Sequence, residues 1–412
     1  MADESKNQNT PKLRFPKFRE PWEDRSIGDF LVESRIPGSD GFVAKKITVK
    51  LWGKGVYEKI EALKGSENTR YFKRRAGQFI YSKLDFLNQA FGIIPKQLDG
   101  YESTVDLPCF DISDGLDSRF LVEYVQRPNF YKKYGDMADG GRKAKRIQVE
   151  SFLSFPLAVP SPAEQRKIAE CLTSLGELIA GQERKVEALR AHKKGLMQQL
   201  FPREGETLPR YRFPEFRNAS EWTERRLGDL GSLVSGLTYS PGDVRDDGLL
   251  VLRSSNIQDG RIALDDCVYV RSDVKGANLS RPNDILICVR NGSKSLIGKN
   301  AIIPAGLPVC TNGAFMTVFR APAPHFVHVL LQTKTYQRQV AADLGATINS
   351  INGSQLLKYR FNVPEAAEQQ RIAACLSSLD ARIAAEAAAL AALRQHKKGL
   401  MQRLFPSGVE EQ

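Results

Sequence analysis

Two stretches of the chain carry the apolar spacing of a coiled coil. In residues 160–202, apolar or seam positions recur at alternating steps of four and three residues, beginning at Ile168. Residues 364–406 repeat this spacing, beginning at Ile372. Proline marks both ends of each stretch and is tolerated only in a helix's first turn. The pattern therefore predicts two helices of about 38 residues, roughly 57 Å long.

The two helical stretches are copies of one another. They align without a gap at an offset of 204 residues, and 25 of 43 positions are identical. A second repeated block, Arg14–Arg19 (RFPKFR) and Arg212–Arg217 (RFPEFR), precedes each globular stretch and leads to Trp22 or Trp222. The chain is therefore one unit written twice, in the order anchor, globular stretch and helix.

The globular stretches diverge, but both contain β-like apolar runs. Examples are Leu249–Leu252 and Ile285–Val289, and Gly77–Ile80 weakly echoes Asn283–Leu286. We predict an α/β protein with internal pseudo-twofold symmetry, in which the helices form an antiparallel coiled coil between two globular domains. The predicted boundaries are a flexible tail (1–10), domain one (11–159), helix one (160–202), domain two (203–363), helix two (364–406) and a tail (407–412). Pairing between two chains is the alternative for the helices, although the duplication already supplies each with a partner.

The composition narrows the classes of protein to which this chain can belong. The 412 residues are 42% hydrophobic and 26% charged, as in ordinary globular proteins, and the net charge is +12. Such an excess favours polyanion binding only weakly. The opening ten residues are polar, six cysteines are scattered without CxxC spacing, and the longest uncharged run, 301–319, contains two prolines. We expect a cytoplasmic protein without a disulfide framework or membrane span.

Motifs for catalysis are incomplete. The chain has no Pro-Pro and thus no [ND]-P-P-[YF] methyltransferase motif. Gly292–Asn300 resembles a phosphate loop, but five residues rather than four separate its glycines, and Asn300 replaces the hydroxyl residue. His325 and His328 suit one helical face without a neighbouring Cys or carboxylate cluster. We expect neither catalysis nor a metal site in this chain; a self-sufficient enzyme remains a rival hypothesis.

The repeated residues support a family resemblance. Pro160 with Ala163–Ile168 (AEQRKI) and the ending LMQQLFP, their second copies, and Trp222–Asp229 (WTERRLGD) resemble the specificity subunit of Type I restriction-modification systems. The resemblance covers nearly all of residues 11–406. It implies two target-recognition domains, each reading one half of a bipartite, asymmetric double-stranded DNA site. The helices would set the gap between half-sites.

The resemblance also implies partners. The helices would dock two methyltransferase subunits and, through them, endonuclease/translocase subunits. S-adenosylmethionine, ATP and Mg would belong to those partners rather than to this chain. A different class of function is a non-catalytic scaffold that holds two ligands apart without binding specific DNA.

Candidate DNA contacts lie on loops that combine cations with hydroxyl and amide groups, since such side chains read base edges and phosphates. Domain one contributes Arg74, Arg75, Lys83, Lys132, Lys133, Arg142, Lys143, Lys145 and Arg146. Domain two contributes Arg253, Ser254, Asn256, Arg290, Asn291, Ser293, Lys294, Thr347, Asn349 and Ser350. Polar residues that recur off the heptad seam are the candidates for partner binding: Glu164, Gln165, His192, Lys194, Glu368, Gln369, His396 and Lys398.

Overall fold

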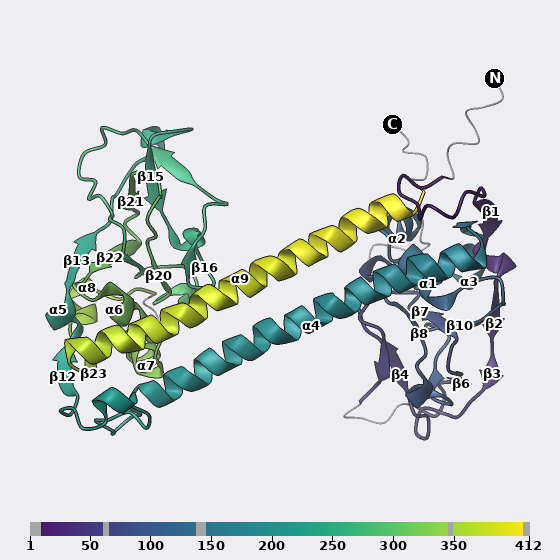
Figure 1. The fold of residues 1–412 in the computed structure, drawn as a ribbon, viewed down its shortest axis with the longest axis horizontal. Coiled ribbons are helices and arrows are strands. Elements are labelled where there is room, and N and C mark those ends of the chain that lie inside the picture. The colour runs from purple at the N-terminus through teal and green to yellow at the C-terminus, as the bar shows by residue number, and fades with distance from the viewer. Residues whose placement is uncertain (1–9, 61–65, 137–145, 345–348, 407–412) are drawn as a thin grey trace. The chain divides into compact units, whose positions relative to one another are not determined.

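The computed structural model describes residues 10–60, 66–136, 146–344 and 349–406. It divides into two compact units. Unit 1 comprises residues 1–183 and 388–412, and unit 2 comprises residues 184–387. Each unit therefore contains one globular stretch together with part of each long helix (Figure 1).

The two long helices are confirmed at their predicted positions. Helix α4 spans Pro162–Leu200 and helix α9 spans Ala366–Leu404, each with 39 residues. Proline opens α4 within its first turn, and a Phe-Pro pair follows each helix, because proline cannot continue it. No helix within the described ranges is both long and apolar enough to cross a bilayer.

Unit 1 is built on a four-stranded sheet in the order β2-β10-β7-β8. Its strands and helices, in chain order, are β1 (Glu23–Ser26), β2 (Leu31–Ser34), β3 (Ile36–Pro37), β4 (Ile47–Val49), β5 (Val56–Glu58), β6 (Phe72–Lys73), β7 (Phe79–Tyr81), β8 (Phe91–Ile93), β9 (Glu102–Ser103), β10 (Cys109–Ile112), α1 (Ser118–Val125), α2 (Pro128–Gly135), α3 (Val149–Ser154) and β11 (Pro156–Val159). Strand β1 pairs with β11, which ends just before α4. The polypeptide thus enters the helix directly from a short sheet.

Unit 2 enlarges the same plan to a six-stranded sheet, β13-β22-β19-β20-β17-β16, beside a four-stranded sheet, β14-β18-β15-β21. Its elements are β12 (Thr223–Arg226), α5 (Leu227–Leu230), β13 (Ser232–Ser235), β14 (Val244–Arg245), β15 (Leu249–Leu252), β16 (Ile257–Gln258), β17 (Arg261–Ile262), β18 (Val268–Val270), β19 (Ile285–Cys288), β20 (Asn300–Ile302), β21 (Cys310–Asn312), β22 (Met316–Arg320), α6 (Pro324–Leu330), α7 (Lys334–Asp343), α8 (Gly353–Leu356) and β23 (Arg360–Val363). Strand β12 pairs with β23 as β1 does with β11. The apolar runs at 249–252 and 285–289 are confirmed as strands.

The weak sequence echo between the globular stretches is a true structural match. Phe79 pairs with Ile93 across β7 and β8, and Ile285 pairs with Ile302 across β19 and β20. The turn before each strand is also the same. The amide of Gly77 donates to Ile94 O at 2.8 Å, and that of Asn283 donates to Ile303 O at 2.9 Å. Both turn residues have a positive φ, 88° and 70°.

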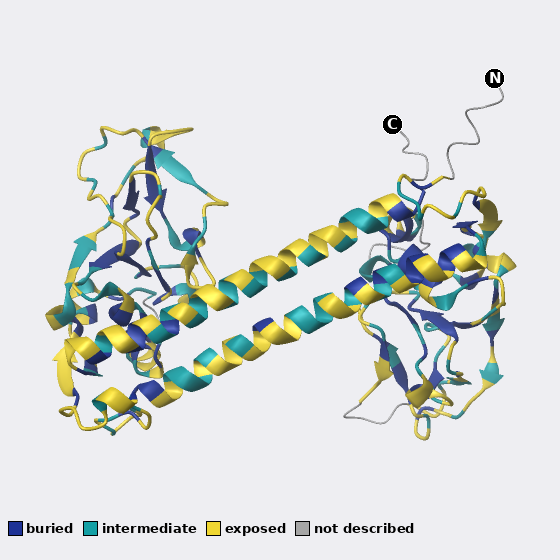
Figure 2. Ribbon diagram, viewed as in Figure 1, coloured by how far each residue is buried: buried dark blue, intermediate teal, exposed yellow. Residues whose placement is uncertain are grey.

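Each core contains the start of one long helix and the end of the other. In unit 1, Ile168 and Leu172 of α4 are buried with Leu404 of α9. In unit 2 the roles are exchanged, with Leu200 of α4 buried together with Ile372 and Leu376 of α9. Figure 2 shows buried segments near both ends of each helix and mostly exposed or intermediate residues between. The helices are therefore part of both hydrophobic cores.

Candidate nucleic-acid interface

The predicted contact loops of unit 2 meet at the ends of two strands. Arg253 and Ser254 follow β15, and Arg290 and Asn291 follow β19. Although these strands belong to different sheets, the Asn291 amide group donates to Ser254 Oγ at 3.0 Å. This side-chain bond joins the two loops.

The segment at residues 349–352 completes this surface. Arg290 forms an isolated antiparallel bridge with Ser350, and the amide of Ile351 donates to Val289 O at 2.8 Å. The Asn349 side chain donates to Gly292 O at 3.1 Å. The structure therefore brings together three predicted loops that lie far apart in the sequence.

Cations at this surface differ in how they are held. The Arg290 side chain is exposed, with its guanidinium 5.7 Å from the ring centre of Phe315. Ser293 and Lys294 are also exposed. Arg253 pairs with Asp266 at 2.8 Å and keeps 34% of its side chain exposed. Arg290 is therefore the best-placed guanidinium for a base edge or phosphate.

Unit 1 assembles the corresponding loops. The amide of Ile147 donates to Lys83 O at 3.1 Å, matching the bond between Ile351 and Val289. Lys83 Nζ lies 3.3 Å from Gln148 Oε1, and Arg146 pairs with Asp106 at 3.3 Å. Ile147 and Ile351 are separated by the same 204 residues as the two helices, and they occupy equivalent places in the two units. Arg142, Lys143, Lys145 and Thr347 fall outside the described residues.

Two predicted DNA contacts are wrong because their side chains are buried. Arg74 is 2% exposed and donates to Ser103 Oγ, Ser34 O and Leu107 O. Burial lowers the pKa of its guanidinium. Asn256 is fully buried. Its side chain accepts from the Arg253 amide and donates to Ala263 O and Asp266 O. Both residues hold loops in shape.

The remaining candidates of unit 1 lie elsewhere on its surface. Arg75 is exposed but precedes β7, whereas Lys83 follows it, so the two occupy opposite ends of that strand. Lys132 and Lys133 are exposed on helix α2 rather than on a loop. The adjacent Tyr131 is 7% exposed and belongs to the hydrophobic core.

Four predicted partner contacts are instead used within the chain. Glu164 and Glu368 are 1% and 2% exposed and bind Arg14 and Arg212 of the anchors. Gln165 accepts from the Asp117 amide at 2.8 Å and donates to Pro160 O at 2.9 Å. Gln369 repeats the second bond with Pro364 O at 2.9 Å. These residues recur because each helix start is fastened in the same way. Burial rules out docking for Glu164, Gln165 and Glu368, whereas Gln369 is only partly buried and its docking role stays a prediction.

The other four, His192, Lys194, His396 and Lys398, are exposed, and their role remains a prediction. Sequence reasoning assigned no role to Arg14 and Arg212, although the repeated RFP-x-FR block was a visible signal. It also missed Gln148 and Phe315, which support Lys83 and Arg290. No repeated spacing distinguishes these two from ordinary surface residues.

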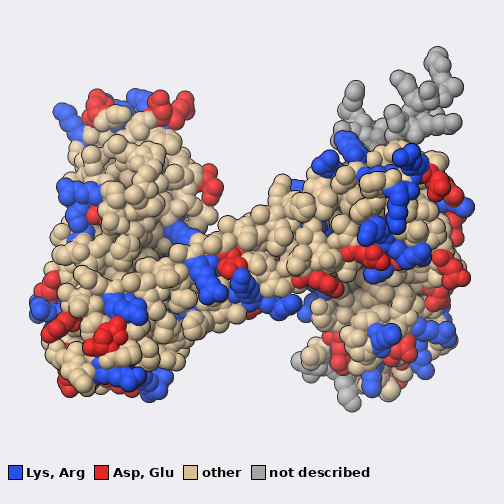
Figure 3. All heavy atoms as spheres, viewed as in Figure 1, with Lys and Arg blue, Asp and Glu red and all other residues tan. Residues whose placement is uncertain are grey.

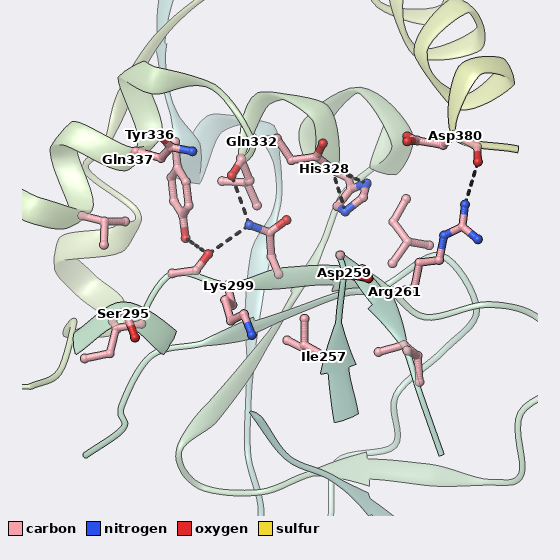
Figure 4. Close-up of a pocket in the computed structure, with 18 of the residues that line it drawn as sticks. Ile257, Asp259, Arg261, Ser295, Lys299, His328, Gln332, Tyr336, Gln337 and Asp380 are labelled. Atoms are coloured by element: carbon pink, nitrogen blue, oxygen red, sulfur yellow. Dashed lines mark hydrogen bonds between the residues drawn. The ribbon is translucent and has the colours of Figure 1, made fainter. Parts of the chain in front are cut away.

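A hollow of about 940 Å³ in unit 2 lies among the β16–β17 hairpin, α6, α7 and α9 (Figure 4). Arg261 points to α9 and donates to Asp380 O at 2.6 Å. Lys193 bonds both carboxylate oxygens of Asp380 at 2.7 and 2.8 Å and Gln332 at 3.1 Å. Burial, with Lys193 nearby, lowers the pKa of His328 to about 4. This region is a polar joint between the globular stretch and the helices.

Charge at the surface is mixed. On the face drawn in Figure 3, basic and acidic side chains are interspersed over both units. The net charge of +12 does not gather into a single basic field on this face. This agrees with the expectation that the overall charge favours polyanion binding only weakly. On this face, charge alone therefore marks no binding surface.

Comparison with known proteins links this chain to Type I DNA specificity subunits. Residues 219–395 match the Type I restriction modification DNA specificity domain. The Type I restriction enzyme StySPI specificity subunit of Salmonella potsdam and the EcoKI specificity subunit of Escherichia coli K12 are each 29% identical over 198 residues. These matches cover 46% of this chain and 42% of each relative, so the chain matches less than half the length of these two relatives.

The matches that cover more of the chain have lower sequence identity. The MjaVIII specificity subunit of Methanocaldococcus jannaschii is 21% identical over 98% of this chain and 96% of its own. The crystal structure of a Type I restriction-modification S subunit from M. genitalium shares the fold, with a TM-score of 0.62 and 15% identity over 97% of this chain and 100% of its own. A chain from a study of assembly and conformational transition in a type I R-M system has a TM-score of 0.54 and 17% identity, covering 95% and 100%. The chain therefore matches the Type I restriction modification DNA specificity domain over residues 219–395 and is similar to Type I specificity subunits over nearly its whole length.

Proposed function

We propose that this chain is the sequence-specific DNA-recognition subunit of a Type I restriction-modification complex. Each unit reads one half of a bipartite duplex site. The observation that carries this proposal is the repeated meeting of two loops, at Lys83 with Ile147 and at Val289 with Ile351. The frame is duplicated while the side chains it presents differ, which suits two unlike half-sites.

The long helices have the length of a spacer. A 39-residue helix measures roughly 58 Å, against about 34 Å for a turn of B-DNA. We assign them to an antiparallel coiled coil that sets the unread gap. Ion pairs flank it, between Glu183 and Arg394 at 2.6 Å in unit 1 and between Lys185 and Glu386 at 2.6 Å in unit 2.

Two methyltransferase subunits are the proposed partners of the helical frame, and endonuclease/translocase subunits join through them. Methyl transfer with S-adenosylmethionine, and translocation and cleavage with ATP and Mg, are assigned to those subunits. The role of this chain is to bind and orient the duplex, so it is proposed to be non-catalytic.

The test has two steps. Methylated positions are first mapped across the genome in cells with and without this chain, which defines the site. Fluorescence anisotropy then compares the intact site with duplexes whose gap is changed by one or two base pairs. We expect tight binding to the intact site and weaker binding to both others. Salt-sensitive binding that ignores sequence and gap would contradict the proposal.

A second test addresses the autonomy of the two units. Replacing residues 28–159 with another recognition domain should change one methylated half-site and leave the other unaltered. The scaffold hypothesis predicts no change in methylation. Changes in both half-sites would contradict independent reading.

A further inference from the structure

One large apolar side chain is exposed at the candidate interface of unit 2. Phe315 lies in the turn between β21 and β22 and is 56% exposed, whereas Phe319, four residues later, is fully buried in the core. A ring left in water forgoes the free energy that burial supplies. Isolated exposed apolar residues are nevertheless common on proteins, so exposure alone does not mark Phe315 as a contact.

The turn that carries Phe315 is fixed between two loops of this interface. The backbone amides of Val289 and Arg290 both donate to Phe315 O at 3.1 Å. On the other side of the turn, the amide of Gly313 donates to Leu252 O at 3.0 Å, at the end of β15. The guanidinium of Arg290 lies 5.7 Å from the ring centre. The ring is therefore presented beside Arg290, from a backbone that is tied to both loops.

Unit 1 has a carboxylate at the equivalent position. The amide of Lys83 donates to Asp106 O at 2.9 Å, as that of Val289 donates to Phe315 O. Strand β10 pairs with β7 as β22 pairs with β19, and in both units the turn residue lies four positions before a fully buried phenylalanine of the strand. The Asp106 side chain pairs with Arg146. The fold therefore does not require a ring here, because an aspartate occupies the same turn.

The ring of Phe315 adds an apolar surface to an otherwise polar group of side chains. Arg290, Asn291 and Ser254 present guanidinium, amide and hydroxyl groups, which suit phosphates and the polar edges of bases. The apolar group on a base edge in the major groove is the 5-methyl group of thymine, and phenylalanine is one of the side chains that contact it. A phosphate has no such group. The chemistry of Phe315 therefore matches a thymine.

We propose that Phe315 is a specificity-determining residue that contacts the 5-methyl group of a thymine in the half-site of unit 2. This inference rests on the proposed function and deepens it by naming one base of the target. Arg290, held beside the ring, contacts a neighbouring base or phosphate of the same duplex. Because unit 1 has Asp106 at the equivalent position, it makes no methyl contact from this turn, and the two units read unlike half-sites.

The experiment replaces thymine with uracil, which removes the methyl group and leaves the hydrogen-bonding groups of the base in place. The half-site that stays unaltered when residues 28–159 are exchanged is the one assigned to unit 2. Fluorescence anisotropy then measures the affinity of the full chain for mapped duplexes that carry one uracil at a time. We expect uracil at one position of this half-site to weaken binding about fourfold, as for the loss of one buried methyl-sized group.

Variants of Phe315 connect this effect to the ring. Phe315→Ala should bind the intact site at least about fourfold more weakly, and the uracil substitution should no longer change its affinity. Phe315→Leu keeps an apolar side chain and should retain most of the discrimination between thymine and uracil. Circular dichroism checks that each variant is folded.

Val309→Ala is the matched control. Val309 is also exposed, but it precedes β21, whereas Phe315 follows that strand, so the two lie toward opposite ends of it. This variant should keep both the affinity and the response to uracil. Uracil in the other half-site should act equally on the unaltered chain and on Phe315→Ala.

Several results would overturn the proposal and leave the proposed function standing. One is a half-site of unit 2 without an A·T pair, and another is a uracil effect of equal size in the unaltered chain and in Phe315→Ala. A rise in 2-aminopurine fluorescence that requires Phe315 would show insertion of the ring between bases instead of methyl contact. A chain that does not distinguish the mapped duplex from other sequences would overturn both proposals.

Discussion

Arg14 fastens the anchor of the first globular stretch to Glu164 on helix α4. Its Nε and Nη2 atoms donate to the two carboxylate oxygens at 2.8 and 2.7 Å. Arg212 and Glu368 repeat this arrangement at 2.9 and 2.6 Å, and Trp222 Nε1 adds a third donor at 3.2 Å. Each pair raises the pKa of its arginine. The anchors are therefore clasps between a segment before each sheet and the helix after it.

Neutralising this clasp should destabilise unit 2. We expect Glu368→Gln to lower the free energy of unfolding by on the order of 3 kcal/mol, because Arg212 loses its anionic partner while mostly buried. Urea denaturation followed by circular dichroism measures the change. Glu187→Gln, at an exposed position of α4, is the matched control and should have little effect. Equal stabilities of the two variants would contradict the clasp.

Removing the exposed guanidinium of Arg290 should weaken DNA binding without unfolding the loop. We expect Arg290→Ala to reduce affinity for the intact site by about 10- to 100-fold and to relax discrimination at one or more positions of one half-site, since a good base contact contributes about 1–3 kcal/mol. Anisotropy with single-substitution duplexes measures both effects. Arg382→Ala, on α9, is the control. A uniform small loss across all sequences would identify Arg290 as a phosphate contact instead.

Shortening both helices should change the gap. Deleting residues 179–185 and 383–389 removes one heptad from each copy and keeps the seam in register. Seven residues correspond to about 10 Å of helix, or roughly three base pairs. We expect the preferred gap to shift while both half-sites stay the same, as read by methylation mapping. Deleting the heptad from α4 alone is the control and should disrupt seam pairing.

The depressed pKa of His328 predicts a stability change in mild acid. Its folded pKa of about 4 lies below the ordinary value of 6.5, so folding favours the neutral ring. The contribution is fully present above pH 6.5 and is lost as the pH falls toward 4, by at most about 3 kcal/mol. Lys193 and His325 oppose protonation, and Asp380 favours it.

Urea unfolding at pH 7, 5.5 and 4 tests this prediction against His328→Gln, which has no proton to gain in this range. We expect the unaltered chain to lose stability relative to His328→Gln as the pH falls. A difference that stays constant would show that His328 titrates normally in the folded protein.

Much of the architecture could be predicted from periodicity. The heptads located both 39-residue helices, and the apolar runs located β15 and β19, because these patterns directly reflect which face is buried. Helix α2 was missed because Tyr131, Lys132 and Lys133 read as a surface loop, whereas Pro128 starts a helix whose aromatic face enters the core.

The site was harder to predict because exposure is a tertiary property. Arg74 and Arg75 are neighbours of the same class, yet one is buried among backbone carbonyls and the other faces solvent. Repetition also led to a wrong prediction at Glu164 and Gln165. Duplication preserves residues that bond within the chain just as it preserves residues that bind a partner, so repetition cannot distinguish the two. The hydrogen bond between Asn291 and Ser254 joins loops that follow strands of two different sheets. No local sequence pattern indicates that these two loops lie together.

The burial of Phe405 in the core of unit 1 has a consequence for synthesis on the ribosome. Trp22 and Phe120 contact a ring that is translated nearly four hundred residues after Trp22. Unit 2 is contiguous, from 184 to 387, and can close its core while the last segment is still being made. The domain synthesised first is thus the last to be completed, and until Phe405 is made its core lacks the ring that packs against Trp22 and Phe120.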